Sequence, residues 1–258
     1  MLESQRGARE LVLAAMATVA LGLPANAGQT EAPVAGTAAV EASAGDLLSD
    51  DEVLRRFLAR PDEPTRSFRA RRRLEVTSGS LGKGAWIDVL VELDVAHGFR
   101  YTVTAAGGSE MLQEKILHKV LRAEQAVYAA GTNARTALTA ENYGLASHGR
   151  TADGLVSLAA TARRKEVGLL NGRFLVSPDT ADLVEVSGTM AKGPSFWIPR
   201  VDLSKRYARL QGHRVNVRVD SVSHVRLLGE SRFTMTSVYE RIDGEAIGVS
   251  AFARVAGP

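Results

Sequence analysis

Apolar and polar side chains alternate with a period of two through much of the chain after residue 67. In residues 68–76, every odd-numbered position is charged, and every even-numbered position is apolar except Arg72. Successive side chains of a β-strand point to opposite faces of a sheet. The alternation therefore predicts a strand with one buried and one solvated face, and it places Arg72 on the buried side.

The next segment, residues 85–95, follows a glycine-rich turn and alternates in the same way. If the two segments pair as a hairpin, three carboxylates share a face with three arginines, namely Asp88, Glu92 and Asp94 with Arg69, Arg71 and Arg73. Opposite charges on neighbouring strands stabilise a sheet modestly. We therefore interpret the arginines as a solvated, charge-matched face. Acidic neighbours oppose a phosphate track, so we expect no nucleic-acid partner.

Strand-like alternation continues to the C-terminal end, with turn residues between the segments. The expected strands cover residues 99–105, 143–149, 154–162, 166–178, 181–192, 196–212, 214–229 and 231–244, and the pattern allows a last one over 247–255. About ten strands without regular strand–helix alternation favour an antiparallel sheet over a parallel one. We predict a mainly β (α+β) fold, a large curved antiparallel sheet or unclosed β-barrel with a helical lid.

Two segments follow a helical period instead. In Ser109–Gly131, apolar residues recur at spacings of three and four, with glycine at the C-terminal end. This helix either packs on the sheet or forms a lid over a cavity. A shorter helix is expected after Ser49, because Ser49 and Glu52 have the spacing of a capping box and Pro61 ends the apolar stripe.

The N-terminal residues have the composition of a targeting signal. Arg6 and Arg9 precede an apolar run, Leu11–Leu23, and Ala25–Ala27 supplies small residues for cleavage. We predict a signal peptide over residues 1–27, cleaved after Ala27, and a periplasmic location; an uncleaved membrane anchor is the alternative. Residues 28–46 are predicted to be a flexible linker, and residues 47–258 to form the folded domain. The chain has no cysteine, so disulfides do not contribute to it.

Leu169–Gly244 has a strand–turn–strand order that resembles the LolA/LolB-like superfamily of periplasmic lipoprotein carriers. The resemblance implies that the domain is a LolA-like half-barrel, an unclosed antiparallel barrel capped by helices. It also implies a concave face that shelters acyl chains or apolar protein segments. No position in this chain matches the arginine that latches the lid of the family's carrier.

Signatures of enzyme and metal chemistry are absent from the sequence. The five histidines are scattered, and the chain has no H-E-x-x-H, G-x-S-x-G, P-loop or dinucleotide motif. We therefore expect no metal, no cofactor and no enzymatic activity. Phe196 and Trp197 are adjacent aromatics that belong either to the core or to the mouth of a pocket.

Export, apolar alternation and the resemblance together favour a non-enzymatic periplasmic carrier or sensor. Its partners would be lipid or lipoprotein acyl chains, bound in the concave face of the half-barrel. The candidate cavity residues are Ile87, Val89, Val91, Leu93, Phe99, Tyr101, Val103 and Trp197. The same residues could instead form a filled core. The alternative function is a cell-envelope scaffold or assembly protein that binds a protein partner.

Overall fold

The computed structural model describes residues 48–60, 65–79, 81–131, 136–226 and 229–248. The predicted signal peptide (1–27) and linker (28–46) lie outside the described residues, as does most of the last expected strand.

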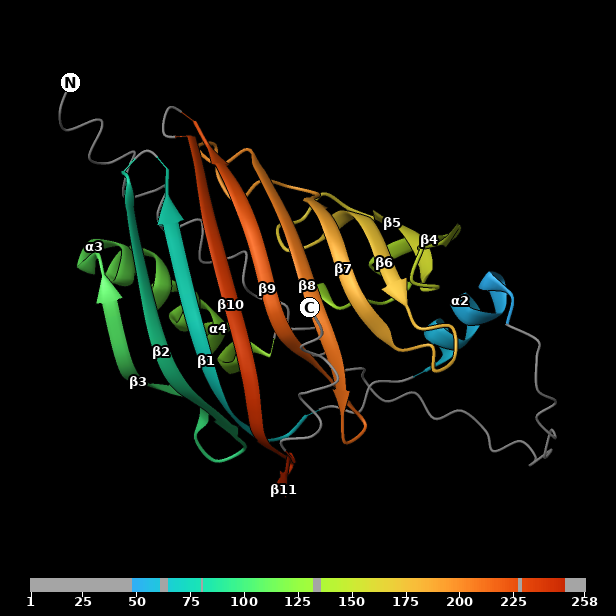
Figure 1. The fold of residues 1–258 in the computed structure, drawn as a ribbon, viewed down its shortest axis with the longest axis horizontal. Coiled ribbons are helices and arrows are strands. Elements are labelled where there is room, and N and C mark those ends of the chain that lie inside the picture. Colours follow the sequence, from blue (N-terminus) through green and yellow to red (C-terminus); the bar gives the residue numbers. More distant parts are fainter. Residues whose placement is uncertain (1–47, 61–64, 80, 132–135, 227–228, 249–258) are drawn as a thin grey trace.

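The described residues form one antiparallel sheet of eleven strands (Figure 1). The strands are β1 (Phe68–Ser78), β2 (Lys83–Asp94), β3 (Gly98–Gly108), β4 (Tyr143–Arg150), β5 (Val156–Ala162), β6 (Leu170–Val176), β7 (Leu183–Met190), β8 (Arg200–Leu210), β9 (His213–Val225), β10 (Gly229–Ile242) and β11 (Glu245–Ala246). Their order is β3-β2-β1-β10-β9-β8-β7-β6-β5-β4, and the short β11 pairs with β10. The sheet is open, with β3 and β4 at its edges, so the predicted fold class is confirmed.

The sheet consists of two meanders joined at a single junction. Strands β1–β3 form the first, β4–β10 form the second, and β1 pairs with β10. The junction extends from the pair Phe68 and Ile242 to the pair Ser78 and Ser231. Long-range pairing of the first and last long strands therefore makes one continuous sheet from both halves of the domain.

The short helix α2 (Asp50–Ala59) begins as its sequence predicts. The Ser49 hydroxyl accepts a hydrogen bond from the Glu52 backbone N–H at 3.3 Å, which satisfies one free amide of the first turn. Val53 and Phe57 are buried, and α2 packs against β4 and β5. The Phe57 ring also meets the Phe174 ring of β6 edge-on, with 6.4 Å between centroids.

The long predicted helix is present but not uniform. It consists of α3 (Glu110–Leu112), the π-helical turn η2 (Gln113–Leu117) and α4 (His118–Ala130), and it ends at Gly131 in the left-handed conformation, with φ of 60°. We call these three elements together the long helix. Adjacent Ile116 and Leu117 in the π turn are both buried. The long helix packs on β1–β3 (Figure 1). No described helix is both long and apolar enough to cross a bilayer.

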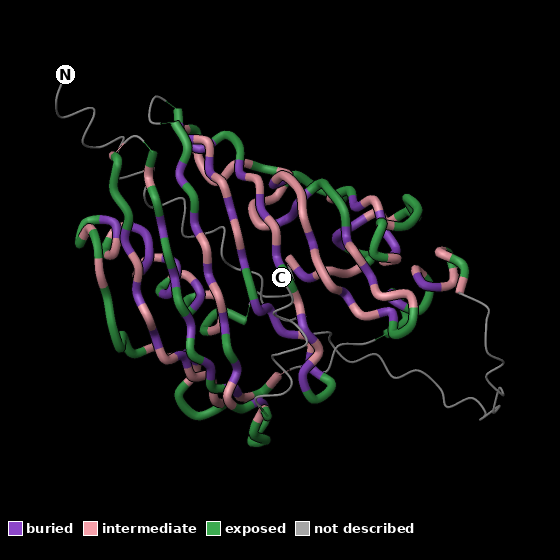
Figure 2. The backbone as a smooth tube through the Cα atoms, viewed as in Figure 1, coloured by how far each residue is buried: buried purple, intermediate pink, exposed green. Residues whose placement is uncertain are grey.

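We call the face on which the helices pack the inner face, and the opposite one the outer face. Buried and exposed residues alternate along β1, as the sequence predicts (Figure 2). On the outer face, Arg73 contacts Asp88 at 3.2 Å and Arg69 contacts Glu92 at 3.6 Å. These residues are direct partners in the β1–β2 register, so the charge-matched outer face is confirmed.

Candidate ligand-binding face

The inner face contains a continuous line of buried, mainly apolar side chains that extends from one meander to the other. A row of directly paired, buried side chains crosses six strands, from Val186 through Lys205, Val219, Met235 and Leu74 to Ile87. We call this set the apolar row, and Lys205 is its only charged member. The described helices pack at the two ends of the sheet, the long helix on β1–β3 and α2 on β4 and β5. Strands β6–β10 lie between these two ends.

Arg72 occupies the inner face of β1, as its position in the alternating pattern predicts. Its guanidinium donates a hydrogen bond from Nη1 to Glu124 Oε2 of α4 at 2.6 Å. Both side chains are buried. Burial, the largest single influence, would lower the pKa of Arg72. The Glu124 carboxylate, together with Tyr239 and Tyr128, outweighs burial and raises the pKa above its ordinary value. This ion pair is a polar connection between the long helix and the sheet.

Aromatic rings surround this ion pair. The Arg72 guanidinium carbon lies 5.8 Å from the centroids of both Phe68 and Phe99, within the range of a cation–π interaction. Phe99 stacks on Tyr128 of α4 at 5.4 Å. Burial raises the pKa of both Tyr128 and Tyr239. The charges are therefore enclosed by apolar surface, where an unpaired charge would be costly.

Lys205 of β8 is the second buried cation of the inner face. Lys205 is 6% exposed, and no charged side chain among the described residues contributes to its pKa. Burial lowers its pKa from 10.5 to about 8. Three further buried side chains of β9 and β10 contain polar atoms without a hydrogen-bond partner, namely Asn216, Ser223 and Ser237.

The predicted cavity residues of β2 and β3 lie at inner-face positions. Ile87, Val89, Val91 and Phe99 are buried. Leu93 and Tyr101 are partly buried against the core, whereas Val103 is 38% exposed. The long helix packs on this end of the sheet, and Tyr101 approaches the His118 ring at 6.2 Å. In this arrangement these residues contribute to the contact between helix and sheet, and their role in ligand binding remains a prediction.

Trp197 lies apart from the β2–β3 group, in the segment before β8. It is partly buried against the core, while the neighbouring Phe196 is 69% exposed. Phe196 stacks under the Arg226 guanidinium, 4.3 Å from its ring centroid. Of the two adjacent aromatics, Trp197 is therefore the one that packs toward the core.

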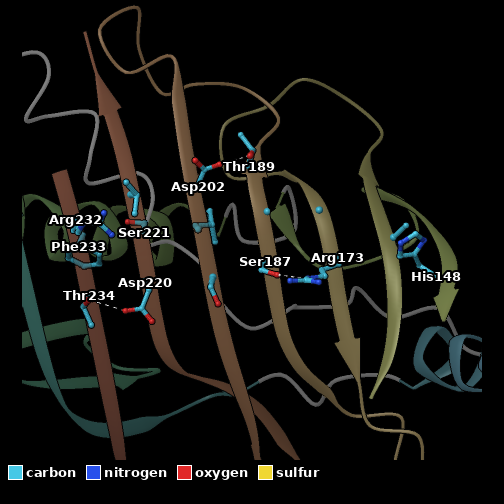
Figure 3. Close-up of a pocket in the computed structure, with 16 residues that line it drawn as sticks. His148, Arg173, Ser187, Thr189, Asp202, Asp220, Ser221, Arg232, Phe233 and Thr234 are labelled. Carbon is cyan, nitrogen blue, oxygen red and sulfur yellow. Dashed lines mark hydrogen bonds between the residues drawn. The ribbon is translucent and has the colours of Figure 1, made fainter. Parts of the chain in front are cut away.

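The outer face has a shallow groove of about 720 Å³ across β4–β10 (Figure 3). Its polar side chains bond to one another. Asp202 Oδ1 accepts a hydrogen bond from the Thr189 hydroxyl at 2.5 Å. Asp202 Oδ2 accepts one from Arg200 at 2.8 Å and lies 3.1 Å from Nε2 of His224. Partial burial opposes ionisation of Asp202, but these bonds hold its pKa below the ordinary value. The groove thus has an internally satisfied polar network.

No metal-binding cluster of three or more His, Asp or Glu side chains occurs among the described residues. The sequence reasoning identified the break at Arg72 but missed Glu124 and Lys205. Glu124 follows Val120 at the four-residue spacing of the buried stripe, and Lys205 has the same parity as Val201 and Leu203. The same periodicity could have identified both as charges on buried faces.

Among known proteins, only solved structures show a similarity to this chain. No family model matches the chain, and no curated protein does. It is similar to a LolA superfamily protein from Nitrosomonas europaea, with a TM-score of 0.36 and 8% identity over 80% of this chain and 97% of that one. It is also similar to a DUF1329 family protein from Desulfovibrio piger, with a TM-score of 0.34 and 11% identity over 75% and 91% of the two chains. We derive the function from this chain's own residues.

Proposed function

We propose that this chain is an exported, non-enzymatic carrier or sensor that binds acyl chains of a lipid or lipoprotein on the inner face of its open sheet. The observation that carries the proposal is the apolar row, which continues across β7–β10 between two helix-covered ends. Burying each methylene group of an acyl chain contributes about 0.8 kcal/mol, so a long chain on such a surface would bind without any covalent chemistry.

The predicted cavity residues of β2 and β3 would contribute to the site if the long helix moves. Ile87 and Val89 are at most 1% exposed beneath it, so a ligand reaches them only when the helix separates from the sheet. The Arg72–Glu124 pair would oppose that separation, because parting two buried charges leaves each without its partner. In this proposal the long helix is a lid over β1–β3. The inner face of the central strands is just as buried in this state, with Val186 and Val219 both 0% exposed, so a ligand must open that region as well.

The first test is direct detection of ligand. Protein purified from the periplasm of an expressing bacterium is examined by native mass spectrometry and then titrated with a fluorescent fatty acid. We expect either a co-purified lipid mass or saturable uptake of the fatty acid. The absence of both would reject the carrier and the sensor alike. N-terminal sequencing of the same sample should begin at Gly28; a chain that begins at Met1 would contradict cleavage and favour an anchor.

The second test locates the ligand with matched cysteine variants, because the chain has no cysteine of its own. Val103→Cys places a thiol at a 38% exposed inner-face position of β3, and Ser204→Cys places one on the outer face of β8. A fatty acid bound on the inner face should slow alkylation of the first thiol and leave the second unchanged. Equal protection at both positions, or protection of Ser204→Cys alone, would contradict an inner-face site.

The scaffold alternative makes a different prediction. If residues 28–46 and the sheet edges hold an envelope protein, deletion of residues 28–46 should abolish capture of that protein. Lipid uptake with no loss of partners after this deletion would favour the carrier or sensor.

A further inference from the structure

Lys205 is the only charged member of the apolar row, and it has no internal counter-ion among the described residues. Its cross-strand partners on the inner face are Val186 and Val219, and both are buried. An isolated ammonium is costly to bury, and a lone buried cation is uncommon for that reason. The position therefore calls for a negative group that contacts Lys205 in the functional state.

The acidic residues of the surrounding strands do not supply that group. Each lies on the outer face and forms an ion pair with an arginine, namely Glu185 with Arg206, Asp202 with Arg200 and Asp220 with Arg218. On the inner face, the Glu124 carboxylate is already bound to Arg72. Among the described residues, the acidic groups that could reach this region are thus engaged elsewhere.

A second buried group without a hydrogen-bond partner lies on the neighbouring strand β9. The register of β8 and β9 shifts between Arg206 and Tyr207, and the first pair beyond this shift joins Tyr207 to Asn216. Asn216 is buried, and neither its amide nitrogen nor its amide oxygen has a hydrogen-bond partner. An ammonium and an amide N–H₂ can both donate to the same anionic oxygen group.

We propose that Lys205, together with Asn216 of the neighbouring strand, binds the anionic head of a single-chain amphiphile, a carboxylate or a phosphate, whose alkyl chain lies on the apolar row. This inference rests on the proposed function and specifies its ligand class. Charge-assisted hydrogen bonds to the head would offset the cost of burying the ammonium, while the row accommodates the chain. Because burial lowers the pKa of Lys205 only to about 8, the side chain is still mainly an ammonium at neutral pH.

The test compares ligands that differ only at the head. Delipidated wild-type protein, Lys205→Met and Lys205→Arg are each titrated at pH 7 with palmitate, hexadecyl phosphate and 1-hexadecanol by competition against a fluorescent fatty acid. Lys83→Met, which removes an exposed lysine at the start of β2, is the matched control. We expect Lys205→Met to weaken binding of the two anions about 10- to 100-fold and to leave 1-hexadecanol unchanged. Lys205→Arg should retain most of the anion affinity.

The outcomes separate this inference from the function on which it rests. If wild type binds all three ligands and Lys205→Met binds them with unchanged affinity, the Lys205 assignment is wrong and the carrier proposal stands. If wild type binds none of them, the proposed function fails as well. Preference for palmitate over hexadecyl phosphate identifies a carboxylate head, and the reverse preference identifies a phosphate. Circular dichroism of each variant checks that the sheet is intact.

Discussion

Arg72 and Lys205 are two cations buried on the same face of one sheet, and they differ in what neutralises them. Arg72 lies beneath the long helix and contacts Glu124 at 2.6 Å. Lys205 lies in the central strands, between apolar partners, with no anion among the described residues. The pKa values move in opposite directions, upward for Arg72 because of its carboxylate and downward for Lys205 because of burial alone.

The comparison distinguishes two uses of buried charge. A paired charge fixes the position of an element, because moving that element exposes two unsatisfied partners. An unpaired charge contributes nothing to the folded state on its own and lowers its stability. We therefore assign Arg72 to the closed arrangement of helix and sheet, and Lys205 to the recognition of a ligand. Substitutions at the two positions should have opposite effects on stability.

The largest expected effect follows removal of one partner of the Arg72–Glu124 pair. Arg72→Met or Glu124→Leu leaves one buried charge uncompensated, and each should lower the free energy of unfolding by about 3–5 kcal/mol. The double variant removes both charges and should recover most of this loss. Urea denaturation at neutral pH measures the complete double-mutant cycle.

The neighbouring residue on β1 provides the control for this cycle. Arg71 points to the outer face, where it contacts Glu240 at 2.7 Å with its side chain 74% exposed. Arg71→Met should change stability by less than about 1 kcal/mol. Similar losses for Arg71→Met and Arg72→Met, or additive losses in the double variant, would show that the buried pair does not hold the helix.

The second effect is a gain in stability from Lys205→Met. The difference between pKa 10.5 in the unfolded chain and about 8 in the folded chain corresponds to about 3 kcal/mol. Between these pH values the unfolded chain binds more protons than the folded one, so the stability of the wild type rises with pH across this window. Lys205→Met should thus be more stable than wild type by about 3 kcal/mol at pH 7, and the gap should close by about pH 10.5.

Denaturation curves from pH 7 to 10.5 for wild type and Lys205→Met test the sign directly. Tyrosines that titrate at high pH are common to both proteins and cancel in the difference. Lys83→Met, at an exposed position, should follow the wild-type curve. A gap that stays constant with pH would mean that the ammonium of Lys205 is not the source of the difference.

Periodicity in the sequence predicts which face of the sheet a side chain occupies, but not which other strand or helix it contacts. Alternation placed Arg72 on the buried face because side-chain direction along a strand is a local property. Its partner Glu124 lies 52 residues away on a helix, and the pairing of β1 with β10 joins residues about three times as far apart in the sequence. Such contacts depend on how elements assemble, and no local pattern records that assembly.

The same holds for the candidate site: the direction of its side chains was predictable from the sequence, but their contacts were not. The inner-face positions of Ile87, Val89 and Val91 were predictable from period two. The packing of the long helix on them was left open by the sequence, since an amphipathic helix suits a filled core and a lid equally well. Lys205 was predictable as an inner-face residue, but its lack of a counter-ion becomes visible only when the acidic residues of β7–β9 are placed on the opposite face.

The smallest expected loss of stability comes from breaking an ion pair that is exposed to solvent. Its response to salt can be compared with that of the buried Arg72–Glu124 pair. Arg73 and Asp88 lie 3.2 Å apart on the outer face, with side chains 45% and 33% exposed. Asp88→Asn should cost about 0.5 kcal/mol or less, and 1 M NaCl should abolish that cost, because the Debye length then falls to about 3 Å. The loss caused by Glu124→Leu should persist in the same salt, since ions do not penetrate between helix and sheet. If salt abolishes both losses equally, Arg72 is accessible to solvent, and its assignment to the closed arrangement is wrong.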